Sequence, residues 1–251
     1  MTETCCIAEK KPVHEPHVLE VKNLHVQYRK TLALRGIDFS VKCGTRVALL
    51  GANGAGKSTL LKAIAGLIHK NAGEIMWRGG KVAKWSREFA YLPQREEVDW
   101  SFPITVRGMV EMGRYPQVGW WRKYTERDHQ AVEAALASLD LLDLQDRQIC
   151  ELSGGQQQRA FLARAVAQEA HVLLLDEPFT GLDRTATAGL ASLLEKMSEE
   201  GRLVIASHHD LSSVRQLFHQ ALLLAGEQIA FGTVDVVVNE QNLARVFPTN
   251  F

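Results

Sequence analysis

A glycine-rich run at Gly51–Thr59 constrains the fold of this chain more than any other feature of its sequence. The run fits the pattern GxxxxGK[ST]. An apolar segment at 46–50 precedes it, and a segment with helical spacing at 57–67 follows it. Strand, glycine-rich turn and helix, in that order, let backbone amides and a helix N-terminus converge on phosphate groups. The sequence therefore predicts a phosphate-binding loop between a strand and a helix.

The side chains of this loop predict its ligands. Lys57 supplies a point charge to the β- and γ-phosphates of a polyphosphate, and Ser58 supplies a hydroxyl to Mg²⁺, which prefers oxygen ligands. A glycine-rich turn without a ligand is the alternative. The binding residues expected in the loop are Gly51, Asn53, Gly54, Ala55, Gly56, Lys57, Ser58 and Thr59.

Two carboxylates follow a second apolar segment. Residues 172–175 read Val-Leu-Leu-Leu and end in Asp176 and Glu177. At the end of a strand, Asp176 is placed to order the Mg²⁺ shell, and Glu177 can polarise an attacking water. Solvated charge at a strand end is the alternative, and the loop upstream favours the catalytic interpretation.

A second candidate anion site lies at Leu152–Gln156, before a helix expected at 157–168. Ser153 is a suitable N-cap, and Gly154 and Gly155 expose backbone amides at the helix N-terminus. A capped helix start without a ligand is the alternative, which spacing alone leaves open.

The order of apolar patterns predicts the fold class. Strand patterns alternate with helical ones, which is typical of an α/β protein with a parallel sheet. Between Arg95 and Gln158 the residue pattern is helical, which predicts a helical block inserted in the α/β core. A polar leader at 1–16 is expected to be disordered. The expected strands lie within 17–41 and at 46–50, 74–77, 89–92, 172–175 and 203–206, and the expected helices include segments around 132–139, 157–168 and 190–197.

Composition excludes several classes of protein. The chain has 251 residues with 29 Lys plus Arg and 29 Asp plus Glu, so it lacks the positive charge of a general nucleic-acid binder. No apolar run approaches the roughly 18–20 residues that cross a bilayer, and the N-terminus lacks a stretch of signal-peptide length. We therefore expect the chain to stay in the cytosol, with no nucleic acid as partner.

Four cysteines and two histidines raise the question of a structural metal. Cys5, Cys6, His14 and His17 could be read as a soft-metal cluster. The four cysteines (Cys5, Cys6, Cys43 and Cys150) show no CxxC spacing, and nothing fixes a coordination geometry. Ligand-type residues in a frayed terminus are the favoured interpretation.

Together these motifs resemble the ATP-binding subunit of ABC transporters, from about Val18 to Phe231. Leu152–Gln156 matches the signature that other P-loop families lack. The resemblance implies a P-loop NTPase core with an N-terminal antiparallel β subdomain and an inserted α-helical subdomain at about 95–160. The whole unit would span 17–251, with ATP and Mg²⁺ as cofactors.

The resemblance also implies further site residues. Tyr28 lies where the family places an aromatic ring against adenine, with a half-buried strand tyrosine as the alternative. Gln94 matches the glutamine that touches Mg²⁺ or water and faces the membrane partner. Asp183, in Gly181-Leu182-Asp183, matches a residue that reaches across a dimer interface, although Gly181 stands where serine is frequent.

The family pattern puts a histidine directly before Asp-Leu, which selects His209 over His208 as the γ-phosphate contact. A histidine can donate a hydrogen bond to that group. The signature residues implied to meet the ATP of a second subunit are Ser153, Gly154, Gly155 and Gln156.

A narrower resemblance lies in the helical block. The segments 99–106, 112–116 and 119–122 are similar to the manganese, zinc and iron group of ABC importers. This implies an ATPase working as a head-to-tail homodimer on a separate integral-membrane permease, at the cytoplasmic face. An extracytoplasmic metal-binding protein would act upstream.

The alternatives are an ATPase for siderophore or cobalamin uptake and a soluble ABC ATPase acting on nucleic acid or ribosomes. The single set of motifs, the lack of sustained heptads and the zero net charge weigh against the soluble class. A cluster of aromatic residues in the block either docks a partner or packs the subdomain, and it comprises Trp100, Phe102, Tyr115, Trp120 and Trp121.

Overall fold

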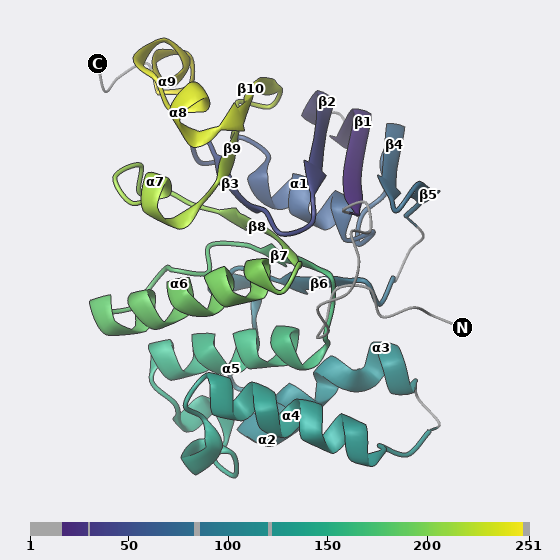
Figure 1. Cartoon of the computed structure of the whole chain (residues 1–251), viewed down its shortest axis with the longest axis vertical. Coiled ribbons are helices and arrows are strands. Elements are labelled where there is room, and N and C mark those ends of the chain that lie inside the picture. The colour runs from purple at the N-terminus through teal and green to yellow at the C-terminus, as the bar shows by residue number, and fades with distance from the viewer. Residues whose placement is uncertain (1–16, 30, 83–85, 120–121, 248–251) are drawn as a thin grey trace.

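The computed structural model describes residues 17–29, 31–82, 86–119 and 122–247. The expected leader at 1–16, with Cys5, Cys6 and His14, lies outside these ranges, as do Trp120 and Trp121. The described chain forms two sheets and a group of helices (Figure 1).

Each strand and helix that the sequence predicted is present in the structure, together with further elements that it did not predict. The strands are β1 Val18–Tyr28, β2 Thr31–Lys42, β3 Arg46–Leu50, β4 Ala72–Trp77, β5 Gly80–Lys81, β6 Phe89–Leu92, β7 Val172–Leu175, β8 Leu203–Ser207, β9 Gln220–Leu224 and β10 Gln228–Thr233. The α-helices are α1 Lys57–Ile64, α2 Val106–Glu111, α3 Tyr115–Val118, α4 Glu126–Ser138, α5 Gly154–Ala167, α6 Arg184–Glu199, α7 Val214–Leu217, α8 Val234–Val237 and α9 Glu240–Val246. Short 3-10 helices are η1 Arg95–Glu97, η2 Met112–Arg114, η3 Leu142–Leu144 and η4 Ile149–Glu151.

The core sheet has the strand order β10-β9-β3-β8-β7-β6. Its pairs from β9 to β6 are parallel, and β10 is antiparallel to β9. Every residue of β3, β7 and β8 is buried, as expected for parallel strands covered on both faces. This confirms the predicted α/β class with a parallel sheet.

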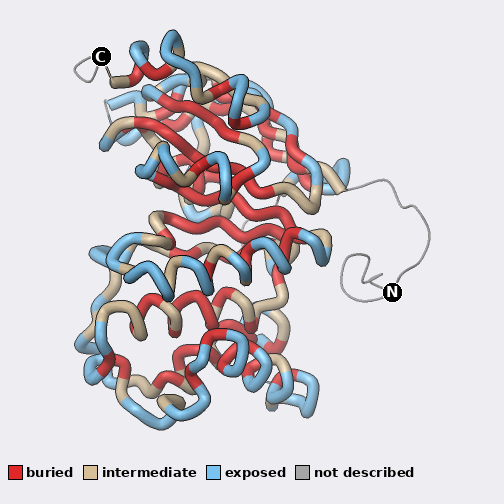
Figure 2. Tube along the Cα trace, turned by 60° about the vertical axis from the view of Figure 1, so that its left-hand side comes forward, coloured by how far each residue is buried: buried red, intermediate tan, exposed pale blue. Residues whose placement is uncertain are grey.

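Alternate side chains of the core strands supply two separate hydrophobic clusters. Val47 and Leu49 pack with α1 and the antiparallel sheet of β1, β2 and β4. Ala48 and Leu50 pack with α5 and α6 on the opposite face. Figure 1 shows these layers above and below the core sheet, and Figure 2 shows the buried stretches running through its strands. The sheet therefore lies between the two hydrophobic clusters and contributes side chains to both.

The antiparallel sheet that the resemblance implied is also present. Its strand order is β2-β1-β4-β5, with Val18 opposite Lys42 in β2 and Leu19 opposite Trp77 in β4. Alternate residues of β1 point into the core, so the sheet has one buried and one exposed face.

Several helix boundaries differ from the sequence-based expectation, and two of them have a clear local cause. The helix expected at 57–67 ends at Ile64, because Gly66 adopts a left-handed φ of 73° and stops the helical repeat. Leu67 is consequently 43% exposed. In contrast, α5 begins at Gly154 rather than 157, because the Ser153 side chain caps its first turn.

The helical elements between Arg95 and Ala167 pack around α5, which contacts both α2 and α4. Buried Arg114 donates from Nε to Asp128 Oδ1 at 2.9 Å and from Nη1 to Glu169 Oε2 at 2.8 Å. This network ties η2 and the start of α4 to the end of α5. The limits of the subdomain at 95–160 and of the unit at 17–251 stay predictions.

Gly113 allows η2 to approach α5 closely. A Cβ at this position would lie 2.2 Å from Arg164 O and 3.3 Å from Ala167 Cβ. Gly113→Ala is expected to destabilise the fold by about 1–3 kcal/mol, because packed backbone must move. Gly189→Ala in α6 is the matched control: it meets open space and should stabilise the helix by up to about 1 kcal/mol. Thermal melting measures both, and equal shifts would contradict the proposed close approach.

Candidate active site

A cleft of about 400 Å³ gathers most of the residues that the phosphate-loop hypothesis named. The end of β1, the loop after β3, the start of α1 and the segments after β6 and β7 all contribute to it. Only Ala33 among its lining residues was not expected from the sequence. The lining residues are Tyr28, Ala33, Asn53, Gly54, Gly56, Lys57, Ser58, Thr59, Gln94 and Glu177.

The phosphate loop that lines this cleft needs glycine at position 56, because the loop backbone approaches Ala33 and Leu34 of β2 closely there. Gly56 has a φ of 96°, and a Cβ there would lie 2.5 Å from Leu34 Cδ2 and 2.9 Å from Ala33 O. Lys57 begins α1 directly afterwards, and its Nζ donates to Gly51 O at 2.8 Å and Ala52 O at 3.0 Å. Burial lowers the pKa of Lys57, while the nearby Glu177 and Asp176 oppose that shift.

Asp176 and Glu177 are held together by a residue that the sequence did not single out. Ser207 ends β8 beside β7, and its Oγ donates to Asp176 Oδ1 at 2.8 Å while accepting from Glu177 N at 2.7 Å. Asp176 is fully buried. The available signal was that Ser207 directly precedes the two histidines at the end of a predicted neighbouring strand.

Gln94 and His209 reach the same carboxylates. Gln94 Nε2 donates to Glu177 Oε1 at 3.1 Å and to Ser58 Oγ at 3.2 Å. His209 Nε2 lies 2.7 Å from Glu177 Oε1. His208 instead turns into the core, where its Nε2 lies 2.8 Å from Ser213 Oγ and burial lowers its pKa. The geometry therefore places His209, and not His208, at the cleft.

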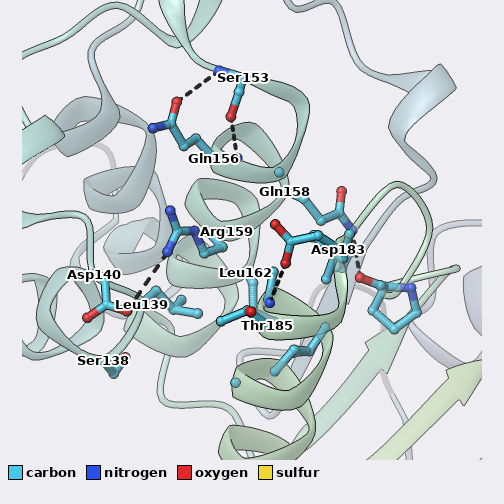
Figure 3. A pocket seen from close by; sticks show the side chains of 17 residues that line it. Ser138, Leu139, Asp140, Ser153, Gln156, Gln158, Arg159, Leu162, Asp183 and Thr185 are labelled. Carbon is cyan, nitrogen blue, oxygen red and sulfur yellow. Dashed lines mark hydrogen bonds and ion pairs between the residues drawn. The ribbon is translucent and has the colours of Figure 1, made fainter.

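Ser153, Gly155 and Gln156 of the signature line a different cavity, of about 310 Å³ (Figure 3). Ser153 Oγ accepts from Gln156 N at 3.4 Å, and Gln156 Oε1 accepts from Ser153 N at 2.9 Å. Asp183 lines the same cavity and caps α6 by accepting from Ala186 N at 2.8 Å. None of the residues lining this cavity lines the first cleft. One chain thus presents the loop and the signature at separate places.

The first cleft contains oxygen donors that fit Mg²⁺. Asp176 Oδ2 is buried without a hydrogen-bond partner among the described residues, and Ser58 Oγ and the Gln94 side chain lie nearby. A hard cation prefers such oxygen ligands. Across the described ranges, no group of three or more His, Cys, Asp or Glu residues is placed to hold another metal ion. His17 lies against Trp77 and accepts from Arg78 Nε at 3.1 Å.

The sequence of the chain matches that of a known family. The family model described as "ABC transporter" matches residues 34–180. The chain belongs to the ABC transporter family. Within it, the chain is an ATP-binding subunit and an ATPase, and such subunits work with membrane permease components. In the ranges that the structure covers, no helix is long and apolar enough to span a membrane.

Several relatives share nearly the whole length. A manganese transport system ATP-binding protein of Halalkalibacterium halodurans is 41% identical over 93% of both chains. A zinc transport system ATP-binding protein of Treponema pallidum is 40% identical over 92% of this chain and 87% of its own length. A solved metal-chelate type ABC transporter in an inward-facing conformation superposes with a TM-score of 0.81 at 30% identity, covering 92% of this chain and 89% of that chain.

Ser207 provides a test of the site geometry. Ser207→Ala removes one hydrogen-bond donor from the buried Asp176 and leaves the Glu177 amide without its partner, which costs about 1–3 kcal/mol. If that cost falls on the active arrangement, ATP hydrolysis slows roughly 10- to 100-fold. Ser212→Ala is the control. It removes an exposed hydroxyl that donates to Asp210, and it should leave the rate unchanged. Steady-state ATPase assays decide, and equal rates for both variants would contradict the role of Ser207.

Proposed function

We propose that this ATPase energises an importer of divalent metal ions, such as manganese or zinc, as a head-to-tail homodimer on the cytoplasmic face of the membrane. The carrying observation is that the phosphate loop and the signature line separate cavities of one chain. Each cavity would supply part of the contacts that a bound nucleoside triphosphate needs. The names of the relatives support the cargo.

In the first cleft, each expected residue has a defined task. The exposed ring of Tyr28 offers a stacking surface for adenine, and the amides of Gly51–Thr59 receive the phosphates. Lys57 would turn from the two loop carbonyls toward the β- and γ-phosphates. Ser58, Gln94 and Asp176 would hold Mg²⁺, which neutralises phosphate charge when it is bound.

Glu177 is the proposed general base. Its carboxylate polarises the attacking water, and Ser207 fixes its backbone amide. His209 shares the Oε1 atom of Glu177 with Gln94 and can donate a hydrogen bond to the γ-phosphate. Binding of nucleotide would replace these contacts between side chains with contacts to the phosphate and water.

The second half of each site comes from the partner protomer. Ser153, Gly154, Gly155 and Gln156 at the start of α5 present a capped helix N-terminus, which favours negative charge. Asp183 lies beside them and would reach across the interface. ATP would hold the two protomers together, and hydrolysis would release them, so that the permease alternates access.

The permease would dock on the helical block. A groove of about 560 Å³ lies along α3 and the start of α4, and its lining includes Tyr115, Arg122, Lys123 and Tyr124. The aromatic residues of the helical block differ in their burial and packing. Trp100 packs on Phe161 with ring centroids 4.9 Å apart, whereas Phe102 is 56% exposed. We assign Phe102 and Tyr115 to docking and Trp100 to packing.

The choice of cargo has one competitor. An ATPase for siderophore or cobalamin uptake is the second candidate, favoured by the likeness to the metal-chelate type transporter. Reconstituted with its permease and its extracytoplasmic binding protein, the complex should increase ATP hydrolysis with Mn²⁺ or Zn²⁺. Stimulation by a ferric chelate alone would contradict the divalent-ion proposal.

Glu177→Gln tests the catalytic assignment. The amide cannot act as a base, so hydrolysis should fall by roughly 100-fold or more while ATP binding persists. The variant should also accumulate as an ATP-bound dimer, measurable by sedimentation. Lys57→Ala, in contrast, should weaken ATP binding, because it removes a charge held against two phosphates. Near wild-type turnover in Glu177→Gln would contradict the assignment.

Phe102→Ala tests the docking surface. Because the ring is exposed, its removal should leave the melting temperature and the basal ATPase activity unchanged. Hydrolysis stimulated by the permease, and transport itself, should fall. The same assays apply to Trp120→Ala and Trp121→Ala, whose positions lie outside the described residues. A large loss of melting temperature would assign the altered residue to the core instead.

A further inference from the structure

Arg95 contacts the signature helix of its own chain. It directly follows Gln94, whose side chain reaches Ser58 and Glu177 in the first cleft. The Cα atoms of consecutive residues are only about 3.8 Å apart. The Arg95 guanidinium reaches α5, where its Nη2 donates to Gln157 Oε1 in the first turn at 3.1 Å.

The guanidinium also lies against Gly154. A Cβ at Gly154 would be 2.9 Å from Arg95 Nη1 and 3.0 Å from both Cζ and Nη2, so the group meets the glycine with its plane. Gln157 is buried, and its Nε2 donates to Ile149 O at 3.1 Å. Arg95 therefore contacts both the first residue of α5 and the Gln157 side chain three positions further along, in the same turn.

A second contact fixes the backbone of Arg95 to the same helix. Trp100 Nε1 donates to Arg95 O at 2.9 Å, and the Trp100 ring packs on Phe161 of α5. The Arg95 guanidinium lies 5.9 Å from the centre of the Trp100 ring. The segment 95–100 thus follows α5 from its first turn to Phe161, about two turns further along.

Helix stability does not account for this contact. A cation beside a helix N-terminus is unfavourable by about 0.3–1 kcal/mol at an exposed site. Arg95 is exposed, and Ser153 already caps the helix. The contact instead joins two functional segments that are 59 positions apart, if counted from Arg95 to Gly154.

We propose that Arg95 is a positioning residue that links the nucleotide cleft of each chain to its own signature helix. When a nucleotide displaces Gln94 from Ser58 and Glu177, Arg95 moves with it and shifts Gly154 and Gln157. Because that signature helix serves the partner's nucleotide, occupancy of one site would set the geometry of the other. The inference rests on the proposed roles of Gln94 and the signature.

Hydrogen exchange of the full chain, with and without Mg²⁺–ADP, tests this link. ADP carries no γ-phosphate for a partner signature to contact, and the chain is used at a concentration where sedimentation shows a monomer. In the wild type, nucleotide should change exchange at both 51–59 and 153–158. Arg95→Ala should keep the change at 51–59 and lose the change at 153–158. Glu96→Gln, on the same exposed turn, should keep both.

If Arg95→Ala does not fold, a matched pair of variants at Gln157, the partner of Arg95, tests the same link. Gln157→Glu and Gln157→Met both lose the bond to Ile149 O, but only Glu keeps an acceptor for Arg95. Glu should therefore retain the response at 153–158, and Met should lose it. A response retained in Arg95→Ala, or retained equally in both Gln157 variants, would overturn the link. The link would also be overturned if nucleotide did not change hydrogen exchange at 153–158 in the wild type. If nucleotide did not change exchange at 51–59, the proposed nucleotide cleft itself would be overturned.

Discussion

The parallel core sheet is the constraint on which the rest of the structure depends. Its strands β3, β6, β7 and β8 run in one direction, so the chain segments that leave them all emerge at one end of the sheet. The phosphate loop, Gln94, the two carboxylates and Ser207 each occupy one of these ends. Burial of the strands on both faces fixes their relative positions to within the tolerance of close packing.

The register between β7 and β8 determines which groups Ser207 contacts. Leu175 of β7 pairs with Ala206 of β8, so the next residues, Asp176 and Ser207, lie side by side. The serine hydroxyl then serves Asp176 and the amide of Glu177 at once. A shift of register by one residue would separate these groups and point them to opposite faces.

The sequence was most informative where a local pattern is physically restrictive. The five residues of β3 and the four of β7 were predicted with their exact bounds, because unbroken apolar runs between turn signals allow few alternatives. The end of α1 was wrong by three residues, since the apolar spacing continues to Leu67 while Gly66 stops the helix. Ser207 and Arg95 were missed because their roles come from contacts between distant segments. The local sequence marks such contacts only weakly, as in the position of Ser207 directly before the two histidines.

The separation of the two cavities leads to the central claim, that each working site is shared between two chains. Mixing two inactive variants tests it most directly. Lys57→Ala impairs the phosphate loop, and Gly155→Asp places a negative charge at the signature. In a shared-site dimer, the mixed pair contains one site with an intact loop from one chain and an intact signature from the other. We predict that the mixture hydrolyses ATP faster than the sum of the two variants alone, and a mixture that only matches that sum would contradict the claim.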